Sequence, residues 1–342
     1  MNQPHKHEFL FMSAILCITL LATIYTVVLS LQPEPQLRQT LDAVQSGDVS
    51  EIKRYLSLDE LAGDDPQSIY FSLKEVKGSE QNLFVLFSSL DYEIVSVNKQ
   101  GDSAVVRTKI ETLDMPKLID DYFAQGIERT RVNAFKTGFG AQTYFSDYHN
   151  PVSMRNNFFY DFNEAAAPRL SRTVDIRMKQ TSSGWKVTLD APLRHALSGG
   201  FVRADGRTFD FSKSVKANLY EAYLYAVGEM WTDIFCDFNS YISTNQRSIN
   251  GGYVEPPQIL QKLEEYAPLK ASHDEYVDQL DAAKYGDVIA SWRSLSKSLD
   301  QMSALLKSKP GEDWVMEMAI DSEAFASVLD PFEKNILKLE EN

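Results

Sequence analysis

The sequence predicts an α+β protein with an N-terminal transmembrane helix, an α+β domain and a C-terminal all-α helical bundle. Three observations predict this organisation: a long uncharged apolar segment near the N-terminus, alternating apolar and polar residues in the middle, and helical periodicity in the last third. Of the 342 residues, 44% are hydrophobic, which is enough to build packed cores. At roughly 100–200 residues per domain, the length allows two domains after the apolar segment.

The apolar segment Phe9–Leu31 contains no charged side chain. As a helix it would extend about 35 Å, compared with about 30 Å for the hydrocarbon core of a bilayer. We therefore predict a transmembrane signal anchor over residues 9–31. A cleaved signal peptide is the alternative, although its apolar region is usually about 7–15 residues long. Lys6 favours a cytoplasmic N-terminus, so residues 1–8 are predicted as a short cytoplasmic tail and the following chain as extracytoplasmic.

Residues 36–209, after a spacer at 32–35, are predicted to form the α+β domain. Apolar residues at helical spacing predict a helix near its start. Residues 92–97 and 104–111 alternate around a turn at 99–102, and residues 174–179 and 185–189 alternate around a turn at 182–184. Alternation with one charged face predicts an antiparallel sheet that exposes one face to solvent. The apolar side chains expected on the other face are Ile94, Val106, Ile176 and Trp185.

Residues 210–342 are predicted to form an acidic helical bundle. They contain 12 basic and 23 acidic residues, a net charge of −11, whereas residues 32–209 have a net charge of −3. A long helix is expected over 212–244, with shorter helices over 258–266 and 272–284. A further helix is expected after Asp287, and a terminal helix with Asp330 as its N-cap and Pro331 at its first position.

The order of elements in the middle of the chain resembles the NTF2-like (cystatin-related cone) domain of membrane-anchored extracytoplasmic Gram-positive bacterial proteins of unknown function. The resemblance covers about residues 36–201. It is carried by the sequences DAVQSGD at 42–48, AVV at 104–106 continuing to TLDM at 112–115, and SGWKV at 183–187.

This resemblance implies a cone-shaped domain with an interior pocket, in which NTF2-like enzymes place Asp, His or Tyr side chains to transfer protons. Four residues of this sequence are candidates for such a pocket: Tyr92, Asp114, Tyr122 and His195. The alternative is that the inner face of the sheet simply packs against the helices.

No pattern in the sequence indicates a catalytic site, a cofactor site or a metal site. The histidines beyond the apolar segment, His149, His195 and His273, are widely separated. The two cysteines, Cys17 and Cys236, cannot form a disulfide framework or a Cys-rich zinc site. We therefore expect no bound cofactor and no metal.

The net charge of −14 argues against nucleic acid as a partner, since such binding depends on clustered Lys and Arg. The expected function is that of a membrane-anchored, non-catalytic binding protein of the cell envelope, whose partner is an envelope protein, a glycan or a small ligand. One alternative is a small-molecule enzyme that uses the cone pocket for acid–base chemistry. A second alternative is a membrane-tethered scaffold that faces the cytoplasm.

Overall fold

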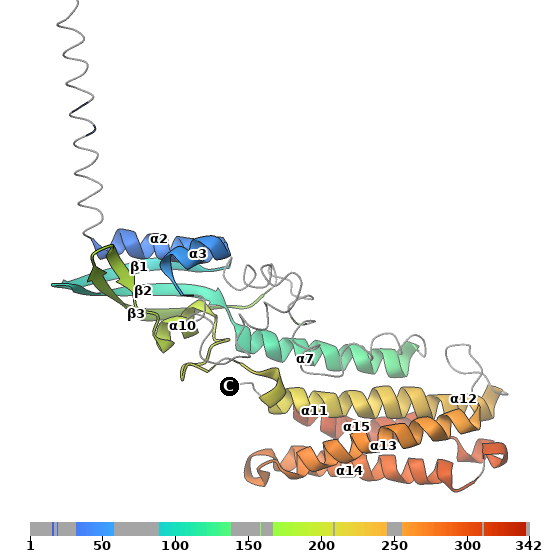
Figure 1. Cartoon of the computed structure of the whole chain (residues 1–342). Coiled ribbons are helices and arrows are strands. Elements are labelled where there is room, and N and C mark those ends of the chain that lie inside the picture. Colours follow the sequence, from blue (N-terminus) through green and yellow to red (C-terminus); the bar gives the residue numbers. More distant parts are fainter. Residues whose placement is uncertain are drawn as a thin grey trace, which may run out of the picture. The chain divides into compact units, whose positions relative to one another are not determined.

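The structure is a computed structural model. It describes residues 32–57, 89–137, 167–207, 209–244, 255–309 and 311–339, together with Leu16, Thr19 and Phe158. The chain divides into two compact units (Figure 1). The first comprises Met1–Met115 and Asn163–Phe209, and the second comprises Pro116–Phe162 and Asp210–Asn342. The boundary predicted near residue 210 agrees with the division between Phe209 and Asp210. However, Pro116–Phe162 is grouped with the second unit rather than with the rest of residues 36–209.

The first unit contains a four-stranded antiparallel sheet in the order β1-β2-β3-β4. The strands are β1 (Asp91–Gln100), β2 (Ser103–Leu113), β3 (Arg169–Thr181) and β4 (Gly184–Val187). The two predicted hairpins are confirmed, because β1 pairs with β2 and β3 pairs with β4. The strand β3 is longer than predicted and begins at Arg169 rather than near Val174.

Helices cover one face of this sheet. They are α2 (Pro33–Ser46), α3 (Val49–Tyr55) and α10 (Ala191–Leu197), and Figure 1 shows α2 and α3 lying along the sheet. Val106, Ile176 and Trp185 are buried on the covered face, as predicted, because alternation points them toward the helices. The helix α2 begins at Pro33, within the predicted spacer, since proline is well suited to the first turn of a helix.

The predicted fold class is corrected in one respect, its transmembrane helix. Apart from Leu16 and Thr19, the segment Phe9–Leu31 lies outside the described residues. Within the described part of the chain, no helix is long and apolar enough to cross a bilayer. The longest described helices carry charged side chains throughout, as α14 does with Lys284, Arg293 and Asp300. The structure therefore supports an α+β protein with a four-stranded antiparallel sheet, but not the predicted transmembrane signal anchor.

The described part of the second unit is helical, and its longer helices lie side by side in Figure 1. A continuous helical segment from Val215 to Thr244 is buried along much of its length and changes from α to π geometry in its middle. The helices of this unit are α7 (Met115–Val132), η1 (Asn133–Thr137), η3 (Phe211–Lys213), α11 (Val215–Leu224), η4 (Tyr225–Phe235), α12 (Cys236–Thr244), α13 (Pro256–Asp278), α14 (Ala282–Lys307), η5 (Gly311–Asp313), η6 (Met316–Met318) and α15 (Ser322–Leu337).

Several helix boundaries in this unit differ from the prediction. A single helix, α13, replaces the two expected over 258–266 and 272–284 and continues through Pro268. The helix α14 begins at Ala282 after its N-cap Asp281, earlier than predicted.

The last helix, α15, begins after Asp321 and contains Pro331 in its interior, so the prediction of Asp330 as an N-cap was wrong. A proline inside a helix removes one backbone hydrogen bond and normally kinks or ends the helix. Here the helix continues because its buried side chains lie at helical spacing on both sides of the proline: Phe325, Leu329, Phe332 and Ile336.

Candidate functional site

The four residues predicted to line a pocket are divided between the two units. Tyr92, Asp114 and His195 belong to the first unit, whereas Tyr122 lies on α7 in the second unit. There Tyr122 packs edge-on against Phe158, with a ring-centroid distance of 5.6 Å.

The three candidates in the first unit take part in contacts that stabilise the fold. The Tyr92 hydroxyl donates a hydrogen bond to Asp42 Oδ1 on α2 at 2.5 Å, and burial together with this carboxylate raises the pKa of Tyr92 to about 12. His195 Nδ1 donates to the carbonyl of Val202 at 2.7 Å. The backbone N–H of Asp114 donates to the Pro168 carbonyl at 2.8 Å. These contacts give Tyr92 and His195 structural roles.

The face of the sheet opposite the helices is exposed and rich in charge. Register and alternation place the odd-numbered residues of β2 and β3 on this face. Two ion pairs neutralise part of it: Arg107 contacts Asp175 at 2.8 Å and Arg169 contacts Glu111 at 2.8 Å. The remaining cations of β3 and β4 on this face are Arg177, Lys179 and Lys186.

We call Arg177, Lys179 and Lys186 together the basic corner. Lys179 on β3 is the direct cross-strand partner of Lys186 on β4, and all three side chains are exposed. Like charges in directly opposite positions of a sheet destabilise it. Arg177 has only a long contact, 3.9 Å to Asp190. Within the described residues neither Lys179 nor Lys186 forms an ion pair, so positive charge accumulates here.

Exposed apolar surface lies on the same sheet face. Val105 is directly opposite Arg177 in the register and is 39% exposed. Val95 is 55% exposed and lies at the irregularity in β1 between Ile94 and Ser96. Exposed Val105 beside Arg177 combines an apolar and an arginine contact, a pairing that protein interfaces use.

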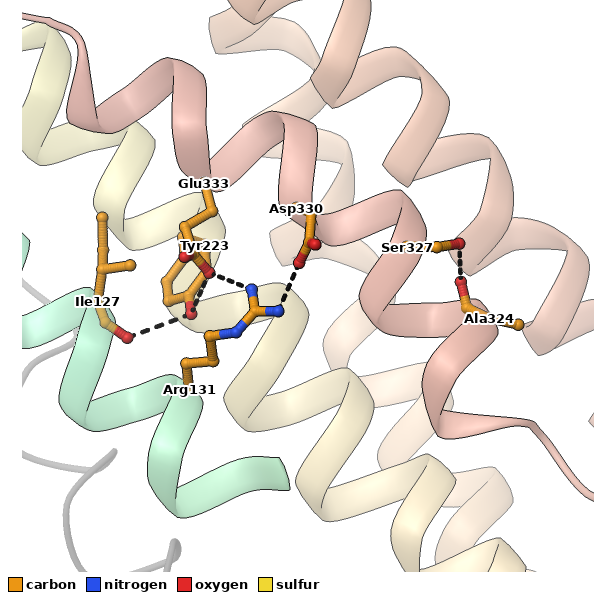
Figure 2. A network of polar contacts seen from close by, with 7 residues as sticks. All are labelled: Ile127, Arg131, Tyr223, Ala324, Ser327, Asp330 and Glu333. Carbon is orange, nitrogen blue, oxygen red and sulfur yellow. Dashed lines mark hydrogen bonds and ion pairs between the residues drawn. The ribbon is translucent and has the colours of Figure 1, made fainter. Parts of the chain in front are cut away.

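In the second unit, a network of charged and polar groups joins α7, α11 and α15 (Figure 2). Arg131 on α7 pairs with Asp330 at 2.6 Å and with Glu333 at 2.8 Å, both on α15. The buried hydroxyl of Tyr223 on α11 lies 3.3 Å from both Glu333 Oε2 and the carbonyl of Ile127. Burial raises the pKa of Tyr223 well above its ordinary value. We interpret this network as a structural one, because every charge in it faces a partner within the unit.

A second network fixes the other end of α7. Lys216 on α11 is 3% exposed and donates to Asp120 on α7 and, at 2.6 Å, to the carbonyl of Leu339. Since Asp120 and Arg131 lie near opposite ends of α7, the helix is attached to the other helices of its unit by an anion at one end and a cation at the other.

Carboxylates also lie buried or half-buried along the π segment η4 and the start of α12. Glu229, Asp233 and Asp237 follow one another at intervals of four residues. Lys262 on α13 contacts Asp237 at 3.4 Å, and the Tyr266 hydroxyl donates to Asp233 at 3.1 Å. Burial raises the pKa of Glu229 to about 8 and also raises the pKa of Asp237. Among the described residues, no group of three or more His, Cys, Asp and Glu could hold a metal ion.

Comparisons with protein-family models, with curated proteins and with solved structures found no match to this chain. The NTF2-like assignment therefore has no support from them and is not carried further.

The sequence prediction did not identify the basic corner. Alternation alone placed Arg177 and Lys179 on the exposed face, but the direct opposition of Lys179 and Lys186 depends on the pairing register of β3 and β4. The geometry of the turn sets this register, and the Ser-Ser-Gly sequence at 182–184 indicates that a turn occurs there but not its exact type or length.

Proposed function

We propose that the protein is a binding protein that recognises an acidic segment of a partner protein through the exposed face of its sheet. The observation that carries this proposal is the basic corner, where Lys179 and Lys186 are directly opposite each other without an anion between them. Like-charge pairing costs stability in the unbound protein, and a carboxylate placed between the two ammonium groups would remove that cost.

The surroundings of the basic corner favour a protein over a nucleic acid. A phosphate backbone needs cations along an extended track. The rest of this face alternates in sign, with the carboxylates of Glu93, Glu111 and Asp175 interspersed among Arg107, Lys109 and Arg169, so it offers no continuous track of cations, and the whole chain has a net charge of −14. Exposed Val105, next to Arg177, offers apolar contact that side chains of a protein partner can use.

The proposal predicts opposite effects of Lys179→Glu on stability and on binding. The introduced carboxylate would face Lys186, so the free energy of unfolding should rise by about 0.2–1 kcal/mol. Binding of a fluorescein-labelled Glu-rich peptide should weaken at least about tenfold, since one attractive contact becomes repulsive. Urea denaturation and fluorescence anisotropy at low and moderate salt measure the two effects in the full chain.

The matched control is Lys53→Glu on α3, an exposed lysine away from this sheet face, which should leave peptide binding within about twofold of the wild type. An equal loss of binding in both variants would mean that only net charge matters and would contradict the proposal. So would the absence of peptide binding by the wild type, or tighter binding to single-stranded DNA than to the peptide.

A further inference from the structure

The covered face of the sheet carries one arginine. Arg172 on β3 is directly opposite Ile110 on β2, which in turn is opposite Tyr92 on β1. Ile110 is 1% exposed, and Val174 and Ile176 follow Arg172 in the same phase of the strand and are also buried. The side chain of Arg172 therefore points toward the helices and not toward the basic corner on the other face.

The guanidinium of Arg172 has an N–H donor group without a hydrogen-bond acceptor. Its Nη1 atom is buried and has no hydrogen-bond partner, and within the described residues Arg172 forms no ion pair. Burial lowers the pKa of Arg172, while the nearby carboxylate of Asp114 acts in the opposite direction. Buried polar atoms without a partner are rare in folded proteins, because each loses its hydration without compensation.

Arg169, three residues earlier on the same strand, has hydrogen-bond partners for its guanidinium. It points to the opposite face, where Nε contacts Glu111 at 2.8 Å and Nη2 donates to the carbonyl of Ser89 at 2.5 Å. The two arginines share a strand and a residue type, but only Arg172 keeps a buried N–H group available.

We propose that Arg172 anchors a binding site for a small oxyanion, a carboxylate or phosphate group, on the covered face of the sheet. A guanidinium N–H donates strongly to such oxygens, and its fixed planar geometry suits their spacing. The field of the Asp114 carboxylate favours a monoanion over a dianion, since a second negative charge would be repelled. This site goes beyond the proposed function and does not depend on it, because it lies on the other face of the sheet.

The test compares the full-length wild type with Arg172→Met and Arg169→Met in sodium acetate, monobasic sodium phosphate and sodium chloride at pH 6 and equal ionic strength. Hydrogen–deuterium exchange of peptides covering β2 and β3 localises the response. In acetate or phosphate, we expect exchange of these peptides in the wild type to slow at least about threefold relative to chloride. The Arg172→Met variant should show no such response, whereas Arg169→Met should retain it.

Slowing in acetate but not in phosphate would indicate a site for a carboxylate, and slowing in phosphate but not in acetate a site for a phosphate group; either result supports the proposal. In chloride, Arg172→Met should protect β2 and β3 at least as well as the wild type does, because an apolar side chain replaces an incompletely satisfied charge. The proposal is overturned by the absence of an anion response in the wild type. It is equally overturned by the same response in Arg172→Met, which would indicate a general salt effect, or by failure of Arg172→Met to fold, which would make Arg172 a structural residue.

Discussion

Replacing Lys216 with methionine is expected to destabilise the second unit by about 3 kcal/mol. Lys216 is 3% exposed, and its ammonium group satisfies both the Asp120 carboxylate and the Leu339 carbonyl. Methionine would fill most of the space but leave both acceptors without their donor. Breaking a buried ion pair in this way usually costs about 3–5 kcal/mol. Because the Asp120 side chain is 26% exposed and can be partly hydrated, we expect the lower end of that range.

Urea denaturation of the full chain, followed by circular dichroism at 222 nm, measures this effect. Lys213→Met is the matched control: its side chain is 75% exposed, and its contact with Asp210 is a surface ion pair worth less than about 1 kcal/mol. Adding Asp120→Leu to Lys216→Met should recover part of the lost stability, since the pair is then replaced by apolar groups. A Lys216→Met variant within about 0.5 kcal/mol of the wild type would show that the pair contributes little.

The second large effect is a loss of stability as the pH rises, caused by Glu229. Burial raises the pKa of Glu229 from 4.5 to about 8 in the folded protein, so folding favours its protonated form. The contribution of protonated Glu229 to the free energy of unfolding is fully present below pH 4.5 and is lost as the pH rises to about 8. The free energy of unfolding should fall by about 1.4 kcal/mol per pH unit in this window, and by about 3–5 kcal/mol in total. Glu221, whose pKa burial raises to about 7, contributes in the same direction.

Glu229→Gln isolates this contribution. Glutamine resembles the protonated side chain, so the variant should match the wild type near pH 4 and exceed it in stability at pH 8. Urea denaturation at several pH values between 4 and 8 gives both curves. Glu264→Gln on the exposed side of α13 serves as the control and should run parallel to the wild type. Parallel curves for Glu229→Gln and the wild type would instead mean that Glu229 is hydrated in the folded state.

Much of the first unit follows from local patterns in the sequence. The alternation in residues 104–110 correctly assigned each side chain to a face, because one face is buried and the other is charged. The same reasoning missed the first residues of β3. Arg172 lies in the buried phase of that strand, so a charged residue stands where the pattern requires an apolar one. Arg172 interrupts the apolar alternation, so the strand was predicted too short. The same placement of a charged side chain on the covered face makes Arg172 a candidate for binding.

Tertiary packing explains the failures in the second unit. Asp330-Pro331 satisfies the local rules for a helix start, yet α15 passes through it because Phe325 and Leu329 must be buried together with Phe332. The burial of Lys216 and Glu229 could not be predicted either. Lys216 is covered by α7 and the chain near Leu339, and the segment η4, which contains Glu229, packs against α13, all distant in the sequence. Patterns along one segment carry no information about which polar residue a distant helix will cover.

The attachment of α7 to α11 and α15 has a consequence for biosynthesis. During translation α7 leaves the ribosome before β3 and β4 are made, and long before the partners of Asp120 and Arg131 on α11 and α15. The second unit therefore cannot complete its core until α15 has emerged, whereas every described strand of the sheet is already available by then. In the interval the α7 residue Phe123 lacks Tyr220 of α11, against which it packs in the folded unit, and exposed apolar surface of this kind makes a partly synthesised chain prone to aggregation.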